Sequence, residues 1–366
     1  DYSVQRMRNE PIVEITQIKG TSETHPRLSP NDKWANFEIV NSRKGKRTAY
    51  SEPDGSYVRQ GLQKGLALNH EERGNPFKIG FIGSTDTHNG AYIFDESDNV
   101  GTAAILTSPE VRGSIPIPNE TLTEDIKNSD FIVADDQGFY SGGETISNSV
   151  GGLAAVWAKA NTRDSIFEAL SNKETYATSG TRIRLRFFAG ENLTNLDFND
   201  EEFISKIYEN GVSMGSDLIL SGVKKPSFII WAQRDKNSAP LQRIQIIKGF
   251  YSEQDRETKE YLIDVVCSDG LKPDPMSKLC ESNNATVSTD TCEFSEDKGA
   301  SELKTVWVDE EYDPKIETFY YVRVLENPTC RWSTWDAIKN NYEPRQGIDE
   351  IIQERAWSSP IWVNSN

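Results

Sequence analysis

The sequence predicts an α/β part over residues 1–180, followed by an all-β, sandwich-like part over residues 181–366. Near the N-terminus, segments typical of a strand, a turn, a helix and a further strand follow one another, as in an α/β layer. After about residue 181, seven strand-like runs separated by turns are accompanied by a single weak helix, which is typical of a β-sandwich. These two patterns set the predicted fold class.

The elements of the α/β part follow from hydrophobic periodicity. Residues 11–19 alternate and are rich in β-branched side chains, which predicts a strand. Residues 57–68 have the pattern of a helix. Lys78–Gly83 (KIGFIG) is a short apolar run that enters the polar turn STDTHNG. We therefore expect a second strand whose end carries polar side chains.

A long segment rich in Gly, Ser, Asn and Asp occupies residues 89–150 and predicts a lid or excursion. Regular structure resumes with a helix for which Thr162 is the expected N-cap. Ile166, Phe167 and Leu170 are expected to form its apolar face.

The β-rich part is predicted from its apolar runs. These runs are RIRLRFF, PSFIIWAQR, LQRIQIIKGF, KEYLIDVV, LKTVWV, TFYYVRVL and SSPIWV. The weak helix falls at residues 201–209. Six tryptophans are expected to pack in the core or between domains. They are Trp157, Trp231, Trp332, Trp335, Trp357 and Trp362.

Composition limits the function classes. The 366 residues are 36% hydrophobic, enough for a buried core, and the net charge is −17. Such a charge repels nucleic acid and anionic membranes, so neither is expected as a partner. A small anionic substrate would need a metal or basic side chains to reverse the field locally. No apolar stretch reaches the roughly 18–20 residues of a membrane span. The polar start without Met suggests a processed or truncated chain.

Four cysteines lie in the last hundred residues, and none forms a CxxC pair. They are Cys267, Cys280, Cys292 and Cys330. A zinc ribbon is therefore not expected, whereas one or two disulfides would restrain the polar loops nearby. Disulfides favour a periplasmic or secreted location. The connectivity does not follow from the sequence.

The string GVSMG around Ser213 matches a serine-hydrolase nucleophile elbow only in its letters. The elbow needs a strand before the serine and a helix after it, and here the order is reversed. That fold also needs a histidine later in the chain, and His88 is the last one. A serine-hydrolase triad is therefore not expected.

Asp86 and His88 are the strongest chemical candidates. Two residues apart on an extended backbone, they would project from the same face at the end of the second strand. A carboxylate and an imidazole can share a divalent cation, which polarises an ester and lowers the pKa of bound water towards ~7. Catalytic zinc takes three protein ligands, and His25, with Glu23 beside it, is the further candidate. The alternative is that Asp86 caps a turn and His88 is an ordinary surface histidine.

Several long strings, among them PIVEITQIKGTSETHP, NPFKIGFIGSTDTHNG and FYYVRVLENPTCRWSTWDA, resemble one family across nearly the whole chain. They are similar to the C-terminal half of a bacterial domain-of-unknown-function family in the polymerase-and-histidinol-phosphatase (PHP) superfamily. The resemblance implies part of a distorted TIM-like barrel with metals at the strand ends. Asp86 and His88 match the superfamily's late Asp-x-His metal motif, which implies Zn, Mn or Fe. The opening His-x-His motif is not present, so the resemblance implies an N-terminal segment or a second chain that completes the barrel.

Supporting roles are assigned to residues near the strand ends. Lys19 could bind an anionic ester oxygen or be a solvated surface lysine. Glu23 and His25 could be ligands, proton shuttles or groups that orient a ligand. Arg182 could bind an anionic substrate through two hydrogen bonds or simply begin a strand. Asn89 could orient water or shape a turn.

Two classes of function compete. The first is a metal-dependent phosphoesterase or sulfatase-type hydrolase acting on a small anionic ester. The second is a non-catalytic protein that binds a ligand or partner through an incomplete barrel. A weaker variant of the first is one subunit of a nicked or heteromeric enzyme.

Overall fold

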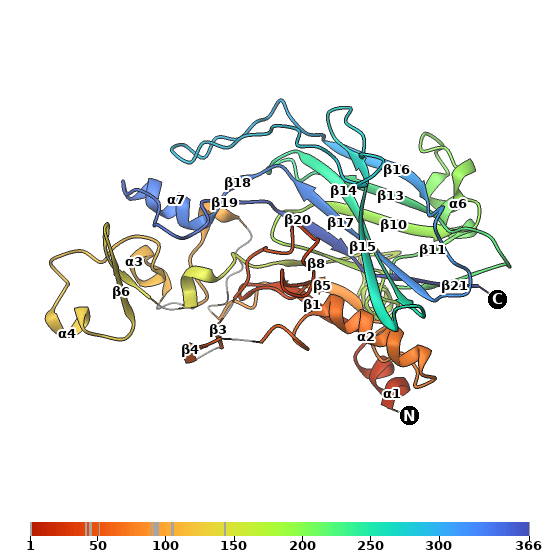
Figure 1. Ribbon diagram of the computed structural model, residues 1–366. Helices are drawn as coiled ribbons and strands as arrows, with labels where there is room; N and C mark the ends of the chain where they lie inside the picture. Colours follow the sequence, from red (N-terminus) through yellow and green to blue (C-terminus); the bar gives the residue numbers. More distant parts are fainter. Residues whose placement is uncertain are drawn as a thin grey trace.

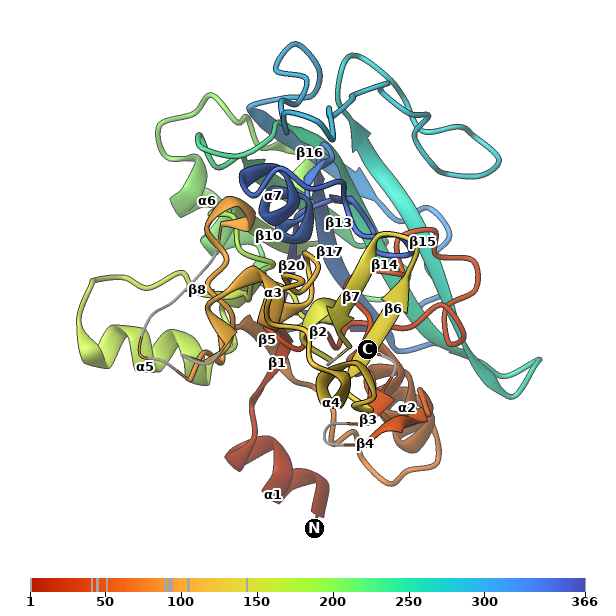
Figure 2. The same ribbon diagram turned by 90° about the vertical axis from the view of Figure 1, so that its left-hand side faces the viewer.

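Three stacked layers form the body of the molecule, and strands from both halves of the chain contribute to them (Figures 1 and 2). A computed structural model describes residues 2–40, 42–43, 46–50, 52–88, 90, 95–103, 106–142 and 144–365. Helices and strands are mixed along these residues, which confirms the coarse α/β prediction.

The first layer is an antiparallel sheet of four strands. In spatial order they are β11 (Val212–Ser213), β10 (Arg184–Gly190), β13 (Ser227–Gln233) and β16 (Glu302–Val308). One face of this sheet packs on helix α6 (Phe203–Asn210), with Phe188 and Ile229 against Ile207. The other face points into the centre of the molecule.

The second layer is a large sheet that runs through the middle of the body. In spatial order, its main path consists of β12 (Asp217–Leu220), β21 (Ile361–Ser365), β17 (Thr318–Glu326), β20 (Arg355–Ser358), β9 (Thr175–Thr178) and β8 (Leu153–Val156). A branch leaves this path at β17, which also pairs with β14 (Leu241–Ser252), and β14 pairs in turn with β15 (Glu257–Cys267). Side chains from this sheet and the first one meet in a single apolar core, which includes Leu185, Phe187, Phe228, Ile246 and Val322. The two sheets therefore pack face to face.

The third layer covers the opposite face of the large sheet. It consists of helix α2 (Val58–His70) and a small sheet of β2 (Gly20–Thr21), β1 (Ile12–Gln17) and β5 (Gly80–Gly83). Leu62, Ile15 and Phe81 pack there against Tyr321 and Trp357. Helix α1 (Tyr2–Asn9) precedes this layer and lies at the lower end of the molecule in both views (Figure 1).

The segment predicted as an excursion projects from the body (Figure 1, left). Its elements are α3 (Pro109–Arg112), α4 (Glu124–Lys127), β6 (Ile132–Asp135) and β7 (Gly138–Ser141). It is fixed to α7 (Trp332–Lys339) because the Arg112 guanidinium donates to both carboxylate oxygens of Asp336, at 2.8 Å each. Short strand pairs elsewhere are β3 (Ser42–Arg43) with β4 (Lys46–Tyr50), and β18 (Thr329–Cys330) with β19 (Ile351–Ile352).

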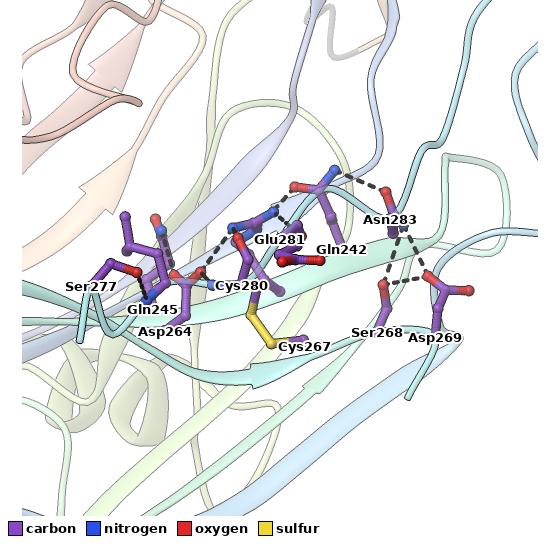
Figure 3. The surroundings of a disulfide bond; sticks show 12 residues. Gln242, Gln245, Asp264, Cys267, Ser268, Asp269, Ser277, Cys280, Glu281 and Asn283 are labelled. Atoms are coloured by element: carbon purple, nitrogen blue, oxygen red, sulfur yellow. Dashed lines mark hydrogen bonds and ion pairs between the residues drawn. A yellow bond between two sulfur atoms is a disulfide. The ribbon is translucent and has the colours of Figure 1, made fainter. Parts of the chain in front are cut away.

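Two disulfides join the four cysteines, which confirms that they are oxidised structural residues. They are Cys267–Cys280 and Cys292–Cys330. Beside the first, the Asp264 carboxylate accepts from the backbone N–H of Cys280 at 2.6 Å and from the Gln245 amide at 2.7 Å (Figure 3). The loop after β15 is therefore held to the large sheet by polar contacts as well as by sulfur.

All seven predicted runs of the β-rich part form strands. Val212–Ser213 follows helix α6 and precedes strand β12, which is the reverse of the order that a nucleophile elbow needs, as the sequence predicted. Helix α5 (Arg163–Ser171) begins at the predicted N-cap, where the Thr162 hydroxyl accepts from the Ser165 N–H at 3.3 Å. Its predicted apolar face is wrong at Phe167, whose side chain is 70% exposed, because the helix buries Ala169 instead.

The sheets do not reproduce a barrel within the described residues. β1 and β5 are parallel, but their small sheet is open and its third strand, β2, runs antiparallel. In addition, β8 and β9 precede residue 181 yet pair into the same sheet as β20. The ranges 1–180 and 181–366 thus share the large sheet. No helix in the described ranges is long and apolar enough to cross a membrane.

Candidate functional site

The carboxyl ends of two parallel strands bring the predicted site together. β1 and β5 are paired in parallel, with Ile12 opposite Gly80 and Thr16 opposite Gly83. Beyond the strand ends, the backbone N–H of Ile18 still donates to the carbonyl of Thr85 at 3.3 Å. Because parallel strands end at one edge of a sheet, the loops that carry Lys19 and Asp86 are held side by side.

Asp86 and His88 converge in the loop after β5. Nε2 of His88 lies 3.5 Å from Oδ1 of Asp86, and the two side chains are about half exposed. The predicted extended backbone is wrong, because Asp86 has φ +50°, in the left-handed region that Asp tolerates better than most residues. The backbone N–H of His88 donates to the carbonyl of Thr102 at 2.7 Å, which ties this loop to the segment after residue 100.

The Gln17 side chain links this pair to the neighbouring strand. Its amide group donates to Oδ2 of Asp86 at 2.7 Å, and its carbonyl oxygen accepts from the Lys19 N–H at 2.7 Å. Gln17 is buried at the end of β1, so its amide is held in place. The sequence analysis did not single out Gln17. The only available signal was its position at the end of a strand parallel to the one before Asp86.

Lys19 lies beside the pair at the surface. Its ammonium donates to the Ser22 hydroxyl at 2.6 Å. The loops crowded around Lys19 lower the pKa of its ammonium by desolvation, while the carboxylates of Glu14 and Asp86 oppose this by raising it. Glu14 itself accepts a hydrogen bond from Ser84. The site therefore combines the Asp86 carboxylate and the His88 imidazole with the cation of Lys19, which Glu14 approaches from strand β1.

Glu23 lies in the core, away from solvent. Its Oε1 accepts from Arg59 at 2.6 Å and from the Tyr321 hydroxyl at 2.8 Å. Its Oε2 accepts from the indole of Trp357 at 2.7 Å, and Arg323 lies within 3.2 Å of both oxygens. Every lone-pair direction of this carboxylate is thus used by the protein itself, which is the arrangement of a structural anchor.

The other two candidates lie in different surroundings. Nδ1 of His25 accepts from the Arg27 N–H at 3.0 Å, and the ring lies 5.5 Å from that of Tyr57. Arg182 is exposed, and its backbone N–H donates to Asp235 at 2.8 Å. It borders a cavity of about 350 Å³ whose lining, which includes Glu354, contains none of the other predicted site residues.

The donor chemistry of Asp86 and His88 fits a divalent cation, although only as part of a ligand set. Their 3.5 Å separation is close to the ~3.4 Å expected for two ligands on one tetrahedral ion. Within the described residues, however, three His, Cys, Asp or Glu side chains are nowhere grouped to hold a metal, so His25 does not complete the set. Asn89 lies outside the described residues.

The fold and the site define a mixed α/β protein with two disulfides and a carboxylate–imidazole pair at the ends of two parallel strands. A family model described as a protein of unknown function (DUF3604) matches residues 1–365, so the chain belongs to that family. A search of the curated proteins and a search of the solved structures each found no match.

Proposed function

We propose that this chain carries part of the active site of a metal-dependent hydrolase that cleaves phosphate or sulfate esters. The observation that carries the proposal is the convergence of His88 Nε2 and Asp86 Oδ1 at 3.5 Å, beside Lys19, at the carboxyl ends of adjacent parallel strands. In a partial PHP-type barrel, this edge is where metal ligands are expected. A sandwich-like part would then follow the barrel.

Asp86 and His88 are the residues of this chain that would hold the metal. A divalent cation supplies a Lewis acid for the ester and lowers the pKa of a coordinated water. Gln17 fixes Asp86 by donating to Oδ2, which leaves Oδ1 directed at His88. Lys19 binds an anionic ester oxygen and stabilises the charge that develops during cleavage.

Further ligands must come from groups other than the predicted set. Glu23 has both oxygens occupied by the core, and no third His, Cys, Asp or Glu among the described residues is grouped with Asp86 and His88 to hold a metal. Arg182, predicted to bind the anionic substrate, borders a separate cavity. A preceding segment or a second chain would supply the remaining ligands. The two disulfides are consistent with an extracytoplasmic location, and we place the protein in the periplasm or outside the cell.

One observation favours the alternative of a non-catalytic binding protein. The described residues contain no group of three metal-binding side chains, and catalytic zinc sites use three. Under this alternative, Asp86 and His88 are a polar pair that shapes a binding surface.

Metal content and ester hydrolysis distinguish the two. Natively purified protein should contain at least one Zn, Mn or Fe per molecule by elemental analysis and should hydrolyse 4-nitrophenyl phosphate or 4-nitrophenyl sulfate. His88→Ala and Asp86→Asn should each lose the metal and lower hydrolysis by at least about 100-fold. His70→Ala is the matched control, since His70 is exposed and stacks on Tyr251 at 4.2 Å.

The possible results separate the hypotheses. Native protein without bound metal would overturn the hydrolase proposal and support the binding protein. Metal that persists in His88→Ala and Asp86→Asn would place the metal site elsewhere. Metal that depends on both residues, without hydrolysis of either ester, would retain the metal site and reject the ester chemistry.

A further inference from the structure

The outer face of the four-stranded sheet is only half covered. Phe188 and Ile229 form one rung of this face and lie under α6. The next rung pairs Arg186 with Trp231, and the one after it pairs Arg184 with Gln233. Side chains two residues apart on a strand share a face, so these rungs continue the same surface beyond the helix.

Five side chains line a shallow hollow on this uncovered half, which we call the Trp–Arg platform. They are Trp157, Arg184, Arg186, Trp231 and Gln233, and the hollow has a volume of about 80 Å³. Trp157 and Trp231 are half-buried, so the prediction that they pack in the core holds only in part. By contrast, Trp332, Trp357 and Trp362 are fully buried.

The aromatic side chains of the platform are fixed by hydrogen bonds. The Trp157 indole donates to the carbonyl of Leu185 at 2.8 Å. On the other side, the indole of Trp231 and the amide of Gln233 donate to the same oxygen of Glu302, at 2.8 and 3.1 Å. The rings are therefore held in position before any ligand arrives, which reduces the entropy lost on binding.

Arg186 is held flat by stacking. Its guanidinium carbon lies 3.5 Å from the centre of the Trp157 ring. Stacking uses the face of the guanidinium and leaves the N–H groups at its edge, which in arginine form a fork for a carboxylate or sulfate. Arg186 is partly exposed, and its Nη1 is buried without a hydrogen-bond partner among the described residues. Arg184 follows two residues along the same strand and is exposed. The Cα atoms of the two arginines are thus about 6.8 Å apart along the strand direction.

The charge of the platform is opposite to that of the chain. Its five lining residues include two cations and no anion, whereas the chain carries −17. The neighbouring Glu302 is balanced by Lys304 at 2.9 Å. Glu174 also faces Arg186, and burial raises the pKa of its carboxyl group while Arg186 acts in the opposite direction. An anionic group is therefore attracted to this part of the surface.

We infer that the Trp–Arg platform binds an anionic polysaccharide, with uronate or sulfate groups on the arginines and a sugar ring against Trp231. A hollow this shallow cannot enclose a small molecule, since enclosing sites measure roughly 300–1,000 Å³. An extended polymer can lie across it. Tryptophan offers a flat apolar face to the C–H groups of a sugar ring. Nucleic acid fits less well, because two arginines supply few of the phosphate contacts that dominate its affinity.

Affinity electrophoresis tests this inference. Gels would contain polygalacturonate, dextran sulfate or uncharged dextran, and mobility would be measured against polymer concentration. We expect retardation by at least one anionic polymer and none by dextran. Arg184→Ala should weaken binding about five- to tenfold. Because the Arg184 side chain is exposed, its removal should leave the folded structure intact. Arg186→Lys preserves the charge but removes the fork, so it should also weaken binding at least about threefold.

The matched control is Arg8→Ala, which removes the same charge from an exposed position on α1, at the opposite end of the molecule from β13 (Figure 1). It should change the affinity less than twofold. The inference is overturned if neither anionic polymer retards the protein. It is also overturned if Arg8→Ala weakens binding as much as Arg184→Ala, or if Arg186→Lys binds as tightly as the unmodified protein.

Discussion

Replacing Glu23 with glutamine tests whether this residue belongs to the chemistry or to the core. The Glu23 carboxylate lies with Asp32 against two arginines, Arg59 and Arg323. These four side chains are at most 3% exposed. Two negative and two positive charges balance in this cluster, and Glu23→Gln removes one negative charge without changing the size of the side chain.

The expected loss of stability follows from the burial of the cluster. After the substitution, Asp32 is the one buried carboxylate left to the two guanidinium groups, and the partly exposed Glu260 compensates Arg59 only weakly. Removing one partner from a buried ion pair typically costs about 3–5 kcal/mol. Glu260 provides the matched control, because it contacts the same Arg59 at 3.3 Å but is 22% exposed. Solvent screens that contact, and Glu260→Gln should cost less than about 1 kcal/mol.

Urea unfolding followed by tryptophan fluorescence measures both variants. Trp357 donates to Glu23 at 2.7 Å, so its emission reports on the cluster directly. A double variant with Arg323→Gln should cost less than the sum of the single variants by at least about 1 kcal/mol, since the pair is removed together. The reasoning is refuted if Glu23→Gln costs no more than Glu260→Gln, or if the double variant is simply additive.

Two further predictions concern pH and the disulfides. Burial raises the pKa of Glu326 and of Glu354 to about 8, so the stability that their protonated forms provide is present below pH ~4.5 and is lost as the pH rises towards 8. Burial alone would also raise the pKa values of Glu23 and Asp32, but Arg323 and Arg59 outweigh burial and lower them. The stability that these two ionised carboxylates provide is therefore lost as the pH falls below ~4. The urea concentration at the unfolding midpoint should therefore peak near pH 5 and decline towards pH 8, and the decline should be shallower in Glu354→Gln. A midpoint that rises from pH 5 to pH 8 would contradict this expectation. Replacing both cysteines with alanine should lower the free energy of unfolding by about 4 kcal/mol for Cys292–Cys330, which are 38 residues apart, and by about 3 kcal/mol for Cys267–Cys280, which are 13 apart. The reverse order in urea unfolding would exclude loop length as the main cause.

The sequence by itself determined the local structure. Short apolar runs separated by turn residues identified all seven strands of the β-rich part, because both signals are local to the segment. The hydroxyl of Thr162 marked the start of α5 for an equally local reason. The Asp-x-His spacing also identified a pair that meets at 3.5 Å, although Asp86 has a positive φ in place of the expected extended backbone.

Only the tertiary structure decided which side chains meet across the chain. Glu23 looked like a site residue because it follows a strand beside His25, yet its partner Arg323 lies 300 residues away. The Gln17 bridge to Asp86 likewise depends on the parallel pairing of β1 and β5. The Trp–Arg platform exists because β10 and β13 pair in one register, which sets Arg186 opposite Trp231. Periodicity reports which face of an element is buried, but it carries no information about the element that will cover that face.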